Sequence, residues 1–205
     1  GVADNIYGGD VALWSKFSNS LKLRMGLLMA DVDNALAQTT VEAAVPGVLM
    51  SNVDNANFTY LSSQPNTNPV HANVVLSGRN DFVAGKTIID FMNATEDPRR
   101  PLWFTTVNGN YIGGEIGSPS TYSAHSHLSD QVVGATANGV MMDYAEVQFL
   151  LAEAAARGYN TGDTPANHHA AGITASMEDW GGSAADIATF LARPDVVYAT
   201  VIANS

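Results

Sequence analysis

The feature that most constrains the fold is an apolar stripe between residues 10 and 30, spaced as on one face of an α-helix. Its members recur three or four residues apart and are Trp14, Phe17, Leu21, Met25 and Leu28. That spacing is typical of an amphipathic helix. Asp10 stands just before the stripe and is suited to cap the helix. We therefore expect a helix over residues 10–30 with this stripe facing the core.

Weaker signals predict three further helices. Residues 31–48 favour a short helix that ends at Pro46-Gly47. Residues 81–94 favour another, which must stop before Asp97-Pro98 because a residue that precedes proline is driven out of the helical region. Ser183 can cap a last helix that Pro194 ends.

Residues 144–157 and 166–180 predict two helices joined by a short loop. The first begins at a capping-box-like Asp143-Tyr144-Ala145-Glu146 and ends at Gly158. Such a pair packs antiparallel in one tetratricopeptide unit, although no second copy follows at the repeat's period of about 34 residues. The residues expected between the two helices are Val147, Leu151, Ile173 and Met177.

The remainder of the chain has the composition of loops. Residues 50–80 are dense in Asn, Ser, Thr and Pro and predict loops with short extended pieces. In the irregular stretch 101–139, Asn108-Gly109-Asn110 lies between short apolar runs and predicts a small hairpin. The expected fold is therefore mainly α, with a tetratricopeptide-like helical core, a loop-rich face and a small β-hairpin.

Composition excludes several functions. Nine basic residues against twenty acidic ones give a net charge of -11, which argues against a nucleic-acid partner and against an anionic lipid surface. This charge is compatible with neutral ligands such as sugars or with bound cations, and its simplest effect is solubility. The chain has no Cys, which excludes disulfides, thiolate nucleophiles and Cys-ligated metals.

Three segments of the chain resemble the SusD/RagB family of nutrient-binding lipoproteins. The first is DNIYGGD at residues 4–10, leading into WSKFSNSLKLR at 14–24. The second is TEDPR at residues 95–99. The third is MDYAEVQFLLAEA at 142–154, followed by AGITASM at 171–177. Their order and spacing agree with the family over nearly the whole chain.

The resemblance implies one SusD-like domain over residues 1–205, a central fragment without the family's lipid-bearing N-terminal part and its C-terminal region. It also implies non-catalytic binding of an oligosaccharide or a peptide at the extracellular face of the outer membrane. The nutrient would pass to a SusC-like, TonB-dependent transporter, and neither a cofactor nor a metal is implied. Two alternatives stay open: a helical scaffold that docks the transporter without binding ligand, and a carbohydrate-active enzyme. The enzyme would need two carboxylates about 5–10 Å apart across a cleft.

Aromatic residues in the irregular stretch are the candidate ligand-binding groups. Trp103, Tyr111 and Tyr122 fall outside any helical stripe, and Asn108 and Asn110 supply polar groups nearby. A sugar ring is recognised by a flat apolar face beside hydrogen-bonding side chains. Packing in the core is the alternative for each ring, and for Trp103 it is the favoured one.

Two other groups of residues carry weaker signals. Glu146 and Glu153 lie seven residues apart on one helical face and could act as an acid–base pair, but capping and surface roles are favoured. His125 and His127 with Asp130 could ligate a metal, but the spacing is short and no fourth ligand is evident.

Overall fold

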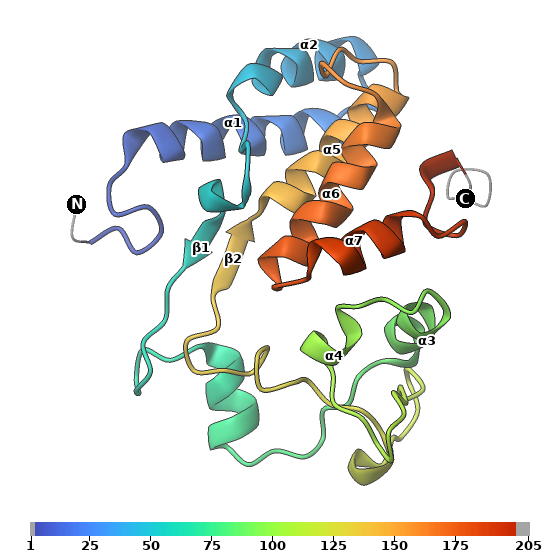
Figure 1. Ribbon diagram of the computed structural model, residues 1–205. Coiled ribbons are helices and arrows are strands. Elements are labelled where there is room, and N and C mark those ends of the chain that lie inside the picture. Colours follow the sequence, from blue (N-terminus) through green and yellow to red (C-terminus); the bar gives the residue numbers. More distant parts are fainter. Residues whose placement is uncertain (1–2, 200–205) are drawn as a thin grey trace. The chain divides into compact units, whose positions relative to one another are not determined.

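The computed structural model describes residues 3–199 and is mainly α-helical, as predicted (Figure 1). The chain divides into two compact units. Unit 1 takes in the chain up to Phe58 and again from Val140, and unit 2 is residues 59–139. The assignment of residues 1–205 to one domain stays a prediction.

Unit 1 contains the strongest helices of the sequence. Its elements are α1 (Val11–Leu28), α2 (Asn34–Ala44), η1 (Val45–Gly47), η2 (Asn52–Asp54), β1 (Ala56–Phe58), β2 (Gly139–Met142), α5 (Tyr144–Ala156), α6 (Pro165–Asp179) and α7 (Ala184–Leu191). β1 and β2 form a two-stranded sheet where the chain leaves unit 1 and returns to it. The sequence did not predict this sheet, because strands this short carry little periodicity.

Unit 2 contains short elements separated by loops. They are η3 (His71–Leu76), α3 (Lys86–Ala94), α4 (Arg100–Trp103) and η4 (Tyr122–Ala124). The predicted helix over 81–94 begins later than expected, because Gly85 is extended with ψ at 141°. The segment before it is held extended by hydrogen bonds from Ala84 N to Ser126 O, 2.7 Å, and from Lys86 N to Gly114 O, 2.8 Å.

The predicted hairpin is present as a tight turn closed by one bridge. Val107 and Asn110 exchange backbone hydrogen bonds of 2.8 and 3.0 Å. Asn108 and Gly109 have φ of 50° and 78°, the left-handed backbone that a two-residue hairpin turn requires. The bridge does not extend along the chain to Phe104, which pairs with Leu128.

The helix caps follow the sequence closely. The Asp10 carboxylate accepts from Ala12 N, and the Asp143 carboxylate accepts from Glu146 N at 2.7 Å. The Ser183 hydroxyl accepts from Asp186 N at 3.1 Å. These side chains satisfy backbone donors that the first turn leaves free, which fixes where α1, α5 and α7 begin.

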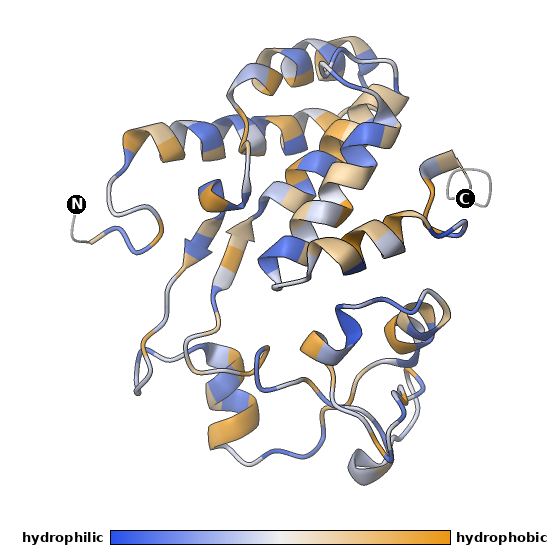
Figure 2. Ribbon diagram, viewed as in Figure 1, coloured by the Kyte–Doolittle hydropathy of each residue, from blue (hydrophilic) through white to orange (hydrophobic). Residues whose placement is uncertain are grey.

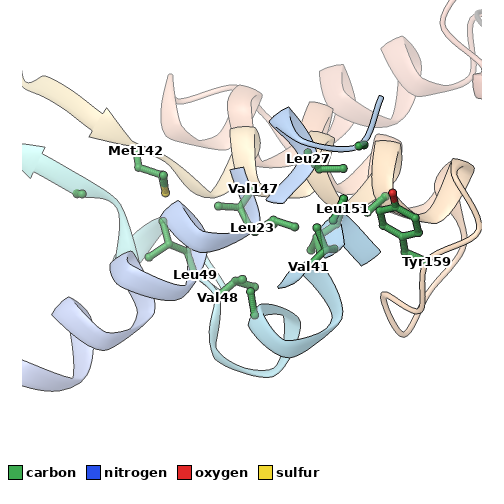
Figure 3. Packing of buried hydrophobic residues seen from close by; sticks show 14 residues of the cluster. Leu23, Leu27, Val41, Val48, Leu49, Met142, Val147, Leu151 and Tyr159 are labelled. Carbon is green, nitrogen blue, oxygen red and sulfur yellow. The ribbon is translucent and has the colours of Figure 1, made fainter. Parts of the chain in front are cut away.

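The core of unit 1 lies between α1, α2 and α5. Figure 3 shows its side chains pointing toward one another from the three helices and from the segment after α2. The labelled members are Leu23, Leu27, Val41, Val48, Leu49, Met142, Val147, Leu151 and Tyr159.

The stripe predicted to face this core is wrong for the C-terminal half of α1. Met25 and Leu28 are 57% and 78% exposed, whereas Leu23 and Leu27 are buried. Apolar and hydrophilic segments alternate along this helix (Figure 2), and large apolar residues lie on both its buried and its exposed side, so periodicity alone did not select the buried side. The partner helix selects it instead, since Gly26 leaves room for the side chains of α2 to approach.

Helices α5 and α6 lie side by side and run antiparallel, as expected of a tetratricopeptide-like pair (Figure 1). Val147 and Leu151 are buried, but in the cluster with α1 and α2. Ile173 and Met177 belong to a second cluster, shared with α7. The prediction that these four form one layer between the two helices is therefore wrong, because each helix turns its large apolar side chains toward a different neighbour.

Smaller and polar groups lie between α5 and α6. A Cβ added to Gly172 would stand 2.9 Å from Phe149, so the glycine marks a close approach of the helices. His168 Nδ1 lies 2.8 Å from Gln148 Oε1, and both side chains are buried. His168 Nε2 also lies 3.1 Å from the hydroxyl of Thr161.

Candidate functional site

A small apolar cluster organises unit 2. Ala84, Ile89, Met92 and Phe104 are buried in it, and the half-buried side chains Trp103, Tyr111 and Leu128 pack against it. Two of the three rings predicted to stack on a sugar, Trp103 and Tyr111, therefore pack against the same apolar cluster.

Trp103 ends α4 and lies beside a fixed cation. The guanidinium carbon of Arg99 is 5.1 Å from the centre of the indole ring, within cation–π distance. Arg99 is held in turn by Asp97, which is 1% exposed. The Asp97 carboxylate accepts from the Arg99 backbone N at 2.9 Å and from its Nη2 at 2.5 Å. The turn that carries the TEDPR resemblance thus positions the side chain that backs this indole.

Tyr111 has a similar environment. The guanidinium carbon of Arg100 lies 4.7 Å from the centre of its ring. Arg100 Nη1 donates to Asn93 Oδ1 at 2.7 Å, and Asn93 Nδ2 donates to the carbonyl of Tyr111 at 3.1 Å. Asn93 therefore fixes both the ring's backbone and the cation that covers it.

Tyr122 lies in η4 and stacks on an imidazole. The centres of the Tyr122 and His127 rings are 3.6 Å apart and the rings are nearly parallel, at 10°. His127 Nε2 hydrogen-bonds to the Tyr122 carbonyl at 2.6 Å, and His125 Nδ1 to the carbonyl of Thr121 at 2.7 Å. Among residues 3–199, no group of three His, Asp or Glu side chains is placed to hold a metal ion.

The two amides of the predicted site lie on the tight turn that precedes Tyr111. Asn108 and Asn110 are exposed, and Asn110 Nδ2 donates to the carbonyl of Asn108 at 3.2 Å. Their side chains can reach a ligand from solvent, and whether they contact one stays a prediction.

The carboxylates considered for acid–base chemistry each pair with an arginine. Glu146 lies 2.6 Å from Arg24 Nη2, and Glu153 lies 2.9 Å from Arg157 Nη2. These contacts tie α5 to α1 and to its own last turn. Such pairing is typical of ion pairs on helix surfaces.

Sequence reasoning missed a polar groove of about 370 Å³ in unit 2. It runs between residues 81–85 and 114–120. Phe82 lines it and is 47% exposed. The sequence predicted a helix over residues 81–94, which includes Phe82, so an extended segment with an open ring was not anticipated. The polar side chains that line the groove are Asp81, Glu115, Ser118 and Ser120.

Unit 1 has two hollows of another character. One, of about 410 Å³, follows α5 at Glu146, Phe149 and Glu153. The other, of about 430 Å³, lies between α1 and α2 at Met25, Leu28 and Thr40. Both lie on helix faces and expose large apolar side chains.

A mainly α fold with an antiparallel helix pair and a small two-stranded sheet agrees with the helical fold of SusD-like proteins. The chain belongs to this family: the family described as "Starch-binding associating with outer membrane" matches residues 1–205. Glycan binding and association with the outer membrane are thus properties of the family. No match was found among curated protein sequences.

Solved structures agree with this assignment. A SusD homologue from Bacteroides uniformis is 30% identical with a TM-score of 0.83, and the match covers 94% of this chain and 41% of that one. A SusD-like protein from Bacteroides thetaiotaomicron is 32% identical with a TM-score of 0.80, over 93% and 40% of the two chains. A chitin-binding SusD homologue from Flavobacterium johnsoniae is 30% identical with a TM-score of 0.78, over 91% and 39%.

The chain thus spans about two fifths of the length of these relatives. None of the helices in residues 3–199 combines the length and apolar character needed to cross a membrane.

Proposed function

We propose that this chain binds an oligosaccharide, without catalysis, as part of a protein on the extracellular face of the outer membrane. The nutrient then passes to a SusC-like, TonB-dependent transporter. One observation carries the proposal: Trp103, Tyr111 and Tyr122 in unit 2 each lie against a cationic or imidazole side chain.

The backing groups make these rings suitable for sugar binding. Stacking on a sugar uses one apolar ring face, and a ring that is already fixed loses less conformational entropy on binding. Arg99 and Arg100 are themselves fixed by Asp97 and Asn93, so the indole and Tyr111 are held before any ligand arrives. Asn108 and Asn110 are the polar groups proposed to contact the ligand.

The comparisons support an uncharged saccharide as the ligand. The family description names starch, and one relative is described as chitin-binding. Both are neutral polymers, which a chain with net charge -11 does not repel. A peptide is the alternative ligand.

The groove carboxylate Asp81 gives little support to the enzyme alternative. Asp81 accepts two hydrogen bonds from Arg79, at 2.8 and 2.5 Å. The Arg79 guanidinium lowers the pKa of Asp81 below its ordinary value. A general acid in a glycosidase needs a raised pKa instead. Asp81 therefore suits a hydrogen-bond acceptor better than a proton donor.

The scaffold alternative is favoured by the hollow between α1 and α2. Met25 and Leu28 expose large apolar surface there, as expected of a face that a protein segment covers. Co-purification of the transporter with the full-length protein and with a Met25→Glu, Leu28→Glu variant tests this. Loss of the transporter only in the variant would assign transporter docking to unit 1.

Isothermal titration with maltohexaose and chitohexaose tests the proposed binding. We expect saturable heat with at least one of these sugars, and a weakening of roughly tenfold in the Tyr122→Ala and Trp103→Ala variants. The matched control is Phe91→Ala, which removes a ring that is 60% exposed on α3. Absence of binding to both sugars, or an equal loss in the control, would contradict the proposal.

A further inference from the structure

The groove between residues 81–85 and 114–120 has a rigid floor. Gly85 and Gly114 pair as a parallel bridge, and Gly114 N donates to the carbonyl of Ala84 at 2.8 Å. A Cβ on Gly113 would stand 2.4 Å from Lys86 Cα and 2.8 Å from Lys86 N. The two backbone segments are therefore in close contact beneath the groove, where no side chain fits between them.

Phe82 offers this groove an aromatic face. The guanidinium carbon of Arg79 lies 4.6 Å from the ring centre, and Arg79 is anchored to Asp81 by a bidentate hydrogen-bonded ion pair. The ring is nevertheless 47% exposed. An anchored cation thus holds the ring while much of its surface stays open. Trp103 and Tyr111 also lie against an arginine, but they are half-buried.

The polar groups beside Phe82 are hydrogen-bonding partners for hydroxyls. Asp81 and Glu115 supply carboxylate oxygens, and Ser118 and Ser120 supply hydroxyls. Carboxylates only accept hydrogen bonds, whereas a serine hydroxyl both donates and accepts. A sugar hydroxyl can donate a hydrogen bond to the carboxylates and can donate to or accept from the serine hydroxyls. A volume of about 370 Å³ lies within the range of roughly 300–1,000 Å³ usual for small-molecule sites.

The charges around the groove discriminate between neutral and acidic sugars. Arg79 is paired with Asp81, and Lys86 is paired with Asp90. Asp90 is the larger cause of the raised pKa of Lys86, and Glu115 also lies close enough to raise it. The three carboxylates Asp81, Asp90 and Glu115 still outnumber the two cations, so one negative charge is left unbalanced. An anionic sugar placed in the groove meets the Glu115 carboxylate, and like charges at such distances repel.

We propose that this groove is a saccharide-binding subsite, with Phe82 as its stacking ring and Glu115 as the residue that selects neutral over anionic sugars. The inference rests on the proposed function of glycan binding and adds a site and a specificity to it. It does not depend on which of Trp103, Tyr111 and Tyr122 contacts the ligand.

Titration of the full chain with maltohexaose, chitohexaose and the anionic trigalacturonate tests the subsite. Phe82→Ala should weaken binding of the neutral sugar roughly tenfold. Phe82→Leu keeps apolar bulk but removes the ring, and it should weaken binding nearly as much. Phe91→Ala, another exposed phenylalanine of unit 2, should leave the affinity unchanged. Thermal melts of each variant establish that it is folded.

Glu115→Gln tests the specificity. Removing the charge while keeping a carbonyl acceptor should raise affinity for trigalacturonate several-fold and change the affinity for the neutral sugar little. Unchanged discrimination in this variant would overturn the role of Glu115.

The outcomes separate the subsite from the proposed function. One outcome is that the wild type binds a neutral sugar, that Tyr122→Ala weakens this binding, and that both Phe82 variants bind normally. In that case the subsite is overturned and the proposed function stands. If the wild type binds neither neutral sugar, both are overturned.

Discussion

Gly26 on α1 lies against Val41 on α2 so closely that a Cβ built on the glycine would stand 2.8 Å from Val41 Cγ2. Val41 is fully buried and β-branched, so its side chain has little freedom to move aside. Overpacking usually costs about 1–3 kcal/mol, and the gain in helix propensity offsets about 1 kcal/mol of this cost. We therefore expect Gly26→Ala to lower the free energy of unfolding by up to about 2 kcal/mol. Urea denaturation measures the difference.

Gly172→Ala is the matched control for this prediction. Its added Cβ would stand 2.9 Å from Phe149, but Phe149 is 40% exposed and can swing toward solvent. The loss should be smaller than for Gly26→Ala. Equal costs at the two glycines would show that side-chain freedom does not decide the outcome.

The starts of the main helices were predictable from the capping residues in the sequence. The side of α1 that is buried was not predictable, because it depends on packing against other helices. Asp10, Asp143 and Ser183 cap helices as predicted, because a cap needs only its own first turn. Met25 and Leu28 were assigned to the core and are exposed, because the buried side of α1 depends on where α2 can approach.

The candidate site was predictable in part for the same reason. Aromatic residues in a loop predicted the three rings, but not the side chains that back them. Arg100 and Tyr111 are eleven residues apart and meet only in the folded chain. Arg99 stands four residues before Trp103, a local spacing whose meaning was missed. Phe82 was missed because its neighbours have helical spacing. The bonds that hold residues 81–85 extended come from Gly114 and Ser126, distant in sequence.

Asp97→Asn should destabilise the chain. Asp97 is 1% exposed and bonds to both the backbone and the guanidinium of Arg99. Removing one partner of a fully buried pair costs about 3–5 kcal/mol. Because the Arg99 side chain is 16% exposed and can regain some water, we expect about 2–4 kcal/mol.

The control for Asp97 is an ion pair of the same spacing on the surface. Arg193 and Asp195 lie 3.0 Å apart with side chains 26% and 47% exposed. Asp195→Asn should therefore cost less than about 1 kcal/mol. A similar cost for the two variants, measured by chemical denaturation, would contradict the role given to burial.

Leu151→Ala should open a cavity between α5 and the helices α1 and α2. Leu151 is 4% exposed within the unit 1 core, so the expected loss in the free energy of unfolding is about 2–5 kcal/mol. Phe149→Ala on the same helix removes a larger but 40% exposed side chain and should cost less. The reverse order in thermal or urea denaturation would place the core on the wrong face of α5.

The stability of the chain should fall as the pH drops below about 6.5, in part through His168. Burial lowers the pKa of His168 below its ordinary value, an effect that the negative charge of Asp163 and the backbone of Thr161 oppose. The folded state therefore binds this proton less readily than the unfolded state, whose histidine titrates near pH 6.5. Stability from this group is complete above that pH and is lost as the pH falls through the lowered pKa.

His168→Gln removes the titrating group, so urea denaturation at several pH values should give a smaller slope of stability against pH. Burial also lowers the pKa of His169, so some slope should remain until both histidines are replaced. Equal slopes for the wild type and His168→Gln would show that the hydrogen bonds to Gln148 and Thr161 accommodate the imidazolium as well as the neutral ring.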